Sequence, residues 1–227
     1  MTISPHVRGT SLRDAQASPV LRRVVLWRWN DRATPEQRLR AKEGLAYISY
    51  ASRVDAVDFG EDIGLSGGAN YGLALLRDHR DKASWDEYAA DPHHARVGGF
   101  IDAITHEEIT ARADYLYKGP ASVRGRVRHL ALYVWRDGID EWKKRDARRA
   151  LAALRAECDA LYALEVAGDL GWAKTGRADL VLEAHFADEP GAAAFLAHPA
   201  YREAAELLAG LTRIERTAAI QHRMKTG

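Results

Sequence analysis

Apolar residues fill most of two segments, 23–29 and 128–135, and this pattern predicts a β-strand in each. Each segment is followed by a longer stretch in which apolar residues recur at positions i, i+4 and i+7, the spacing of one helix face. Thr34 and Asp140 are the expected N-caps of these helices, and Gln37 completes a possible capping box with Thr34. The residues expected to face the core are Ala41, Leu45 and Ile48 in the first helix and Ala147, Leu151 and Leu154 in the second.

Both halves of the chain continue in the same order. Further strands are predicted over 54–59, 71–76 and 109–116 in the first half and over 161–166, 179–186 and 216–222 in the second. A glycine-containing connection, interpreted as a hairpin, separates the second strand from the third. A helix broken by a proline precedes the last strand. Each half therefore predicts a β-α-β-β-α-β unit, which is the ferredoxin-like arrangement.

The two halves are copies of one sequence. "LWRWND" at 26–31 matches "LYVWRD" at 132–137 with an offset of 106 residues, and one extra residue then changes the offset to 107. "THEEITA" at 105–111 still faces "TRIERTA" at 212–218 without a further gap. Because caps, apolar stripes and turns agree over about ninety residues, the sequence indicates a duplicated domain.

The duplication defines the expected domain organisation: a tail (1–20), a first unit (21–118), a linker (119–125) and a second unit (126–227). A ferredoxin-like unit covers only one face of its sheet with helices, so the other face needs a partner. Here that partner is in the same chain. The predicted fold class is α+β, with two tandem ferredoxin-like units forming one intramolecular pseudo-dimeric barrel. The side chains expected between the two sheets are Val24, Leu26, Leu130 and Leu132.

Composition narrows the classes of function. The chain has 33 Lys and Arg against 32 Asp and Glu, a formal net charge of +1, so no overall field attracts nucleic acid or an anionic membrane. Cys158 is the only cysteine, which excludes an intramolecular disulfide, and its place on an apolar stripe predicts a buried thiol. No window approaches eighteen apolar residues and no signal peptide is recognisable. We expect a soluble, cytoplasmic protein without a membrane or nucleic-acid partner.

The segment "YAADPHH", which begins at Tyr88, carries the candidate catalytic residues. A histidine can take or give a proton near neutral pH, and a tyrosine can donate a hydrogen bond to a developing enolate. Tyr88 and His94 would not share a face of an unbroken helix, but a break at Pro92 permits them to converge. Alternatively, Asp91 is simply an N-cap and His93 and His94 lie in the first helical turn. A metal site is disfavoured, because consecutive helical residues do not easily face one ion.

One face of the first strand of each unit is the other candidate region. Period-two alternation places Arg23, Trp27 and Trp29 on this face in the first unit, with His129 and Tyr133 at the matching positions of the second. Such aromatic residues most often belong to the core, but this face can also hold a cavity under the helices. An arginine there would suit a carboxylate or enolate oxygen. The candidate substrate-binding residues are Arg23, Trp27, Trp29, His93, His129, Tyr133 and Tyr201.

The motifs "RRVVLWRWND", "YGLALL", "YAADPHHA" and "FLAHPAY" resemble, in their order and spacing, the stress-responsive dimeric α/β-barrel (Dabb) family. The resemblance covers nearly the whole chain after residue 20, twice over. Single-unit members form the barrel by dimerisation, so two units in one chain imply an internal pseudo-dimer. The first copy resembles the cofactor-free cyclases of this family, of the olivetolic acid cyclase type, which implies acid–base roles for Tyr88 and His94.

The second copy departs from that motif. Phe195 stands at the tyrosine position and Tyr201 at the position of the final histidine. His129 matches a histidine that opens the first strand in many relatives, and Arg23 replaces it in the first copy. The cyclase's strand-three histidine is matched by leucines in both copies, Leu73 and Leu180.

These features favour a cofactor-independent lyase, cyclase or isomerase that acts on a small carbonyl-containing or polyketide-like molecule by Tyr–His acid–base chemistry. Neither a cofactor nor a metal ion is expected. Two alternatives stay open: a cofactor-free monooxygenase of activated phenols, and a non-catalytic, stress-associated ligand-binding barrel. Further homo-oligomerisation is compatible with the sequence, but barrel closure does not require it.

Overall fold

The computed structural model describes residues 19–51, 56–66, 70–119 and 126–224. The predicted tail (1–20) and linker (119–125) therefore lie almost entirely outside the described residues. Within the described part, each unit has the predicted β-α-β-β-α-β order, except that the helix broken by proline is two helices. The first unit consists of β1 (Val20–Trp27), α1 (Pro35–Ala51), β2 (Ala56–Glu61), β3 (Leu73–His79), α2 (Lys82–Ala90), α3 (Pro92–Ala103) and β4 (Ala111–Tyr117). The second consists of β5 (Val127–Tyr133), α4 (Glu141–Glu157), β6 (Leu161–Gly168), β7 (Leu180–Phe186), α5 (Glu189–Ala197), α6 (Pro199–Leu211) and β8 (Ala218–Arg223).

The strands form two antiparallel four-stranded sheets, with the orders β2-β3-β1-β4 and β6-β7-β5-β8. Short 3₁₀ helices, Glu107–Ile109 and Ile214–Arg216, precede the last strand of each unit. The sequence placed the end of the third strand at Leu76, but β3 continues to His79. This extension matters for the site, because it adds Arg77 and His79 to the face that the helices cover.

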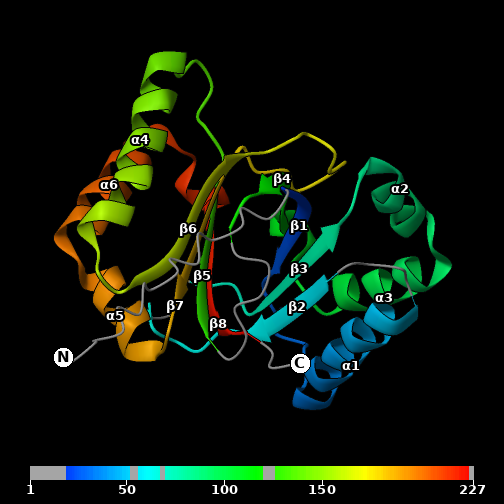
Figure 1. Ribbon diagram of the computed structural model, residues 1–227. Helices are drawn as coiled ribbons and strands as arrows, with labels where there is room; N and C mark the ends of the chain where they lie inside the picture. The colour runs from blue at the N-terminus through cyan, green and yellow to red at the C-terminus, as the bar shows by residue number, and fades with distance from the viewer. Residues whose placement is uncertain (1–18, 52–55, 67–69, 120–125, 225–227) are drawn as a thin grey trace, which may run out of the picture.

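The two sheets pack against each other through their bare faces, and the helices lie outside them. In Figure 1, α4, α5 and α6 flank one sheet while α1, α2 and α3 flank the other. The edge strands β4 and β6 are neighbours, as are β8 and β2, so the two sheets close into one barrel. Val24, Leu26, Leu130 and Leu132 are fully buried in the core between the sheets, which confirms the prediction.

Each unit also binds the edge of the other sheet through its β2–β3 or β6–β7 connection. In the first unit's connection, the Ile63 and Tyr71 amides donate to β8 carbonyls at 2.9 and 2.8 Å. In the second, the Ala178 amide donates to the Arg112 carbonyl of β4 at 2.8 Å. These bonds occupy backbone groups that an open sheet edge would leave unpaired. The connections predicted as hairpins therefore also join the two halves.

Charged side chains link the two sheets at the end of the barrel interior. Arg22 pairs with Asp78 of its own unit at 2.6 Å and with Glu183 of the second unit at 2.8 Å. Arg128 reaches across in the opposite direction, to Asp58 at 2.5 Å. Because these arginines and Glu183 are almost fully buried, separating the units would leave uncompensated charges.

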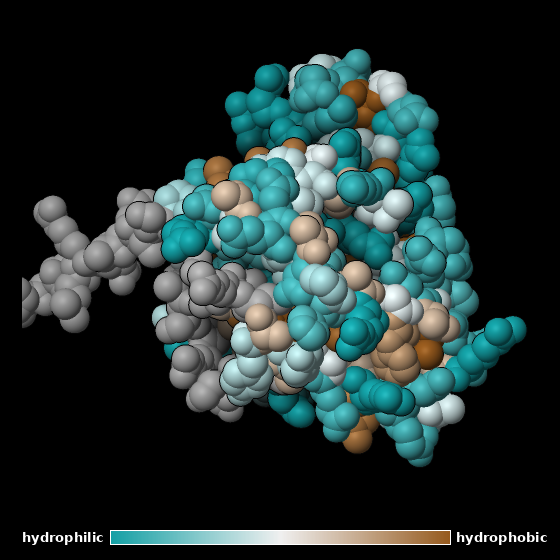
Figure 2. All heavy atoms as spheres, turned by 90° about the vertical axis from the view of Figure 1, so that its right-hand side faces the viewer, coloured by the Kyte–Doolittle hydropathy of each residue, from teal (hydrophilic) through white to brown (hydrophobic). Residues whose placement is uncertain are grey.

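The outer surface over the first unit's helices is mainly hydrophilic, with scattered apolar patches (Figure 2). Cys158 is buried, as predicted from its place on the apolar stripe. In the described part of the chain, every helix is too short or too polar to cross a lipid bilayer.

Candidate functional site

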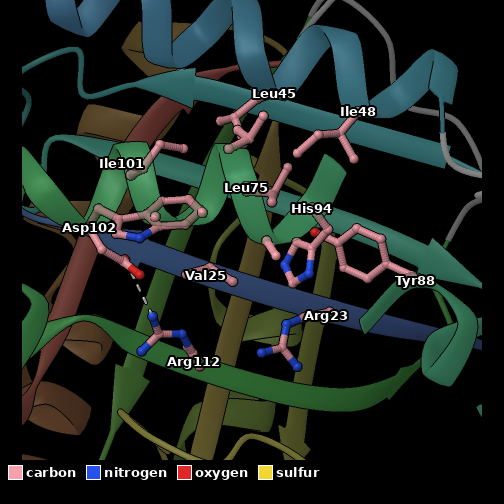
Figure 3. Close-up of a pocket in the computed structure, with 15 residues that line it drawn as sticks. Arg23, Val25, Leu45, Ile48, Leu75, Tyr88, His94, Ile101, Asp102 and Arg112 are labelled. Atoms are coloured by element: carbon pink, nitrogen blue, oxygen red, sulfur yellow. Dashed lines mark ion pairs between the residues drawn. The ribbon is translucent and has the colours of Figure 1, made fainter. Parts of the chain in front are cut away.

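A cavity of about 210 Å³ lies between the helix-covered face of the first sheet and helices α1 and α3. Arg23, at one end of this face of β1, and Tyr88 and His94 line it together (Figure 3). The apolar part of its wall is formed by Val25, Trp27, Leu45, Ile48, Leu75, Val97 and Ile101. The fold thus brings the two candidate catalytic residues and two of the candidate binding residues, Arg23 and Trp27, around one cavity.

A helix break brings Tyr88 and His94 together. The Asp91 side chain accepts a hydrogen bond from the His93 amide at 2.8 Å, and Pro92 is the first residue of α3. Asp91 is therefore the N-cap, as predicted. The same break turns α3 so that the ring centroids of Tyr88 and His94 lie 4.1 Å apart. The two interpretations of this segment thus hold together: a capped helix start is what makes the side chains converge.

Burial keeps both groups uncharged. It lowers the pKa of His94 to about 4, and the positive charges of Arg23 and Arg77 act in the same direction. It also raises the pKa of Tyr88, although Arg77 opposes this shift. At neutral pH the site therefore presents a neutral imidazole that can accept a proton and a phenol that can donate a hydrogen bond.

Two arginines next to this pair differ in how their charges are balanced. Arg23 forms an ion pair with the fully buried Asp114 at 3.0 Å, and the Trp85 indole donates to the same carboxylate at 2.9 Å. Arg77 is 1% exposed and lies over the Tyr88 ring at 3.5 Å. Its Nε and Nη2 have no hydrogen-bond partner in the part of the chain that the structure describes. Because a buried cation normally has a compensating anion, this end of the site is electrostatically suited to negative charge.

The opposite end of the cavity has a second polar pair. Arg112 of β4 and Asp102 of α3 lie 3.7 Å apart, and Figure 3 shows them across the apolar wall from Tyr88 and His94. Burial raises the pKa of Asp102, which Arg112 opposes. The cavity therefore offers polar groups at both ends with an apolar middle.

Several predicted site residues lie elsewhere. Trp29 is beyond the end of β1, where Arg38 lies over its ring at 5.4 Å, and His93 faces outward to the Tyr47 hydroxyl at 3.4 Å. Tyr133 is buried in the hydrophobic core of the second unit. None of the three lines the cavity. The reason is geometric: strand alternation ends with the strand, and adjacent residues on a helix point in different directions.

His129 and Tyr201 form a separate pair in the second unit, with His129 Nε2 and the Tyr201 hydroxyl 3.0 Å apart. They belong to a different groove, of about 430 Å³, and do not reach Tyr88 or His94. The set of candidate residues predicted from the sequence therefore divides between two locations, one in each unit.

Sequence reasoning missed Arg77, His79 and Asp114. Arg77 and His79 continue the alternation of Leu73 and Leu75, so a longer third strand would have placed them on this face. Burial lowers the pKa of His79 to about 4, and its ring lies 5.4 Å from that of Tyr88. Among the described residues, no group of three His, Cys, Asp or Glu side chains is arranged to hold a metal ion.

Comparison with protein families gives one match: the model of the stress-responsive A/B barrel domain fits residues 21–112 and again residues 127–219. A comparison with curated proteins found no match.

Two solved structures that match along nearly the whole chain show the same fold. An anthrone oxidase-like protein is 13% identical, with 91% of this chain and 92% of that chain covered and a TM-score of 0.68. A putative monooxygenase from Fusobacterium nucleatum is 8% identical, with 92% and 94% covered and a TM-score of 0.52. A dimeric ferredoxin-like protein of unknown function from Thermobifida fusca is 27% identical. The match covers 47% of this chain and 99% of that chain, with a TM-score of 0.41.

Proposed function

Because the chain belongs to the stress-responsive A/B barrel domain family, and its first unit holds a cavity with an acid–base pair, we propose that it is a cofactor-independent enzyme. The proposed reaction moves a proton on a small carbonyl compound. One observation carries this proposal. Tyr88 and His94, whose ring centroids lie 4.1 Å apart across the break at Pro92, line a cavity next to Arg77, a buried arginine with no ion-pair partner among the described residues.

The proposed chemistry starts from the protonation states of the free site. Neutral His94 removes a proton from the carbon next to the substrate carbonyl, while Tyr88 donates a hydrogen bond to the carbonyl oxygen. Negative charge then develops on that oxygen, close to the charges of Arg23 and Arg77. The same negative charge raises the pKa of His94 while the enolate exists, so the base becomes stronger as the reaction proceeds. Return of the proton to another atom of the substrate gives an isomerase. Expulsion of a leaving group from the next carbon, with the proton transferred from His94 to that group, gives a lyase. Attack of the enolate carbon on a second carbonyl of the same molecule, whose oxygen takes the proton, gives a cyclase.

The cavity favours a small substrate. Its volume of about 210 Å³ is below the range of about 300–1,000 Å³ that is common for drug-sized ligands. Arg112 and Asp102 offer a second polar contact at the opposite end of the cavity, and apolar side chains separate them from the acid–base pair. A compact molecule with a carbonyl at one end and a hydroxyl or carboxylate at the other matches this arrangement better than a long polyketide chain.

Proton abstraction is tested by hydrogen exchange with solvent. The protein is incubated in D₂O with aryl methyl ketones, 2-oxo acids and 4-oxo acids, and deuterium incorporation next to the carbonyl is followed by NMR. For any compound that exchanges, His94→Gln should lower the rate about 10²- to 10⁴-fold, the usual range for a general base. Tyr88→Phe should lower it through the lost hydrogen bond. The matched control is His93→Gln, because this neighbouring histidine faces outward.

A second pair of variants asks whether the reaction occurs in this cavity. Gly98 lines the cavity, and a Cβ added there meets no atom within 4 Å, so Gly98→Leu should obstruct substrate without straining the fold. Ala205→Leu makes the matched change at the equivalent position of α6 and should leave the rate unchanged. Exchange that survives Tyr88→Phe, His94→Gln and Gly98→Leu, or no exchange with any compound, contradicts the proposal.

An oxygenase would use the same first step, because a deprotonated activated phenol can react with O₂. The two activities differ in their need for oxygen. Product formation at full yield under anaerobic conditions favours the lyase, cyclase or isomerase reaction, and O₂ consumption that depends on His94 favours the monooxygenase.

A further inference from the structure

A chain of hydrogen bonds in the second unit ends at the groove that His129 and Tyr201 share. The Gln221 amide nitrogen lies 2.8 Å from His129 Nδ1, and His129 Nε2 lies 3.0 Å from the Tyr201 hydroxyl. Gln221 and His129 are almost fully buried, at 0% and 1% exposure. The groove of about 430 Å³ is otherwise mainly apolar, with Leu65, Ala193, Leu196, Ala197 and Ala219 in its wall.

The first unit determines the direction of this chain. Asp62, a carboxylate that only accepts hydrogen bonds, takes one from the Asn70 amide nitrogen at 2.8 Å. That nitrogen and the Ser66 hydroxyl both donate to Gln221 Oε1, at 2.9 and 2.5 Å. The Gln221 amide is thereby oriented with its nitrogen toward His129. Turning it around would place its nitrogen against the Asn70 amide nitrogen, which can only donate, and turning Asn70 as well would place the Asn70 oxygen against the Asp62 carboxylate.

The orientation of the Gln221 amide determines the tautomer of His129 and, through it, the direction of the Tyr201 hydroxyl. Since Nδ1 of His129 accepts from Gln221, the ring proton is on Nε2, which donates to the Tyr201 oxygen. The Tyr201 hydroxyl proton is then free to point into the groove. Burial lowers the pKa of His129 to about 4 and raises that of Tyr201 to about 12, so both remain neutral and His129 has no lone pair left to act as a base.

We propose that this groove is a second ligand site, distinct from the cavity in the first unit, that binds a small neutral molecule through a carbonyl or ether oxygen accepting from the Tyr201 hydroxyl. The apolar wall contacts the rest of the ligand. Charge has little part in this recognition: Arg202 is the cation of the groove and is exposed to solvent, while the Asp62 carboxylate lies behind Asn70. Because Asp62, Ser66 and Asn70 come from the first unit, the site requires both halves of the chain.

The test uses 4-fluoroacetophenone, a neutral aryl ketone, followed by ¹⁹F NMR titration. The Gly98→Leu protein is used, so that the first cavity does not contribute to binding. We expect saturable binding that Tyr201→Phe weakens about three- to tenfold, the effect of one neutral hydrogen bond. Ala197→Trp, which fills the groove from an exposed position, should abolish it, and Ala205→Leu, on the same helix as Tyr201 but outside the groove, should leave it unchanged. 4-Fluorobenzoate, the anionic counterpart, should bind more weakly than the ketone.

The direction of the hydrogen-bond chain can be measured directly. In ¹⁵N-histidine-labelled protein at neutral pH, His129 should be protonated at Nε2 and unprotonated at Nδ1. The opposite tautomer, absence of saturable ketone binding, ketone binding unaffected by Tyr201→Phe, or tighter binding of the benzoate would each overturn the proposal. None of these results bears on proton transfer at His94, so the two sites are tested separately.

Discussion

At equivalent positions beneath their helices, the first unit carries charged and acid–base side chains and the second carries neutral ones. Strand register defines the equivalence: Arg23 lies opposite Arg77 and Asp114, and His129 lies opposite Ala184 and Gln221. The sequence repeat, at its offset of 107 residues, pairs His79 with Phe186, Tyr88 with Phe195 and His94 with Tyr201.

The difference shows what each unit does with the space that the fold provides. In the second unit, the buried rings of Phe186 and Phe195, 5.1 Å apart, fill the positions of His79 and Tyr88 with ordinary core packing. In the first unit, Arg77 is buried instead, and no ion-pair partner for it is present in the described part of the chain, which costs folding free energy. At the position of Tyr88, one backbone therefore supports aromatic core packing in the second copy and the wall of a polarised cavity in the first.

The largest expected effect comes from separating the units. Expressed alone, residues 1–120 or 121–227 would each expose an apolar sheet face, two open sheet edges and halves of the Arg22–Glu183 and Arg128–Asp58 pairs. We expect each half to be insoluble or to form homodimers, as measured by sedimentation velocity. A well-folded monomeric half would contradict the interdependence of the two units.

The next effect is acid unfolding, to which both units contribute. Burial lowers the pKa of His79 and His94 in the first unit, and of His129 and His222 in the second, from 6.5 to about 4. Between these values the unfolded chain binds more protons than the folded one, so the free energy of unfolding falls as the pH decreases from 6.5 to 4. The fully buried His129 and His222 should each contribute about 3 kcal/mol to this loss.

The acid effect is measured by urea unfolding at a series of pH values. His222→Gln removes one of these protonation sites and should recover about 2 kcal/mol at pH 4.5 relative to pH 7. His106→Gln makes the same substitution at a half-exposed histidine and serves as the matched control. Stability that is constant from pH 7 to pH 4 would contradict the buried, neutral state of these histidines.

The smallest effect distinguishes the two arginines of the first unit. Arg77→Met removes a buried cation that has no ion-pair partner within the described residues, and it keeps a similar volume. The free energy of unfolding should therefore rise by about 1–3 kcal/mol, while the pKa of His94 moves up toward 6.5. Arg23→Met instead leaves Asp114 buried without its partner and should lower stability by about 3–5 kcal/mol.

Urea unfolding gives the stabilities of these two variants, and an NMR titration gives the pKa of His94. Opposite signs for the two substitutions are the expected result. If Arg77→Met destabilises the protein as much as Arg23→Met, then Arg77 is a structural ion-pair residue rather than a cation held for function.

The fold could be predicted from the sequence to a large extent, because duplication doubles each signal. The apolar stripe of α1 is short, but it has the same spacing as that of α4. This agreement predicts both helices and aligns the two copies residue by residue. Thr34 and Gln37 form the predicted reciprocal capping hydrogen bonds. Asp140 occupies the N-cap position of α4, but its side chain accepts no capping hydrogen bond from the helix backbone.

The site could be predicted only in part. Tyr88 and His94 became candidates through their chemistry and, above all, through the resemblance of their segment to the family's motif, and Pro92 through its effect on a helix. All of these are read from a short stretch of sequence. The partition of His129 and Tyr201 into a separate groove, and the exclusion of Trp29 and His93 from the cavity, depended on where strands end and which way helices turn.

By itself, the sequence determined the repeated β-α-β-β-α-β order, the residues between the sheets and the helix break at Pro92, because these follow from periodicity, capping and the missing proline amide. Only the tertiary structure decided that Arg77 is buried against Tyr88 with no ion-pair partner from the parts of the chain described. It also decided that Asp62, Asn70 and Ser66 of one unit orient Gln221 and His129 of the other. Those contacts join residues up to 159 positions apart, as between Asp62 and Gln221. No local pattern encodes such pairs, since their energies depend on burial and on which groups the closed barrel brings together.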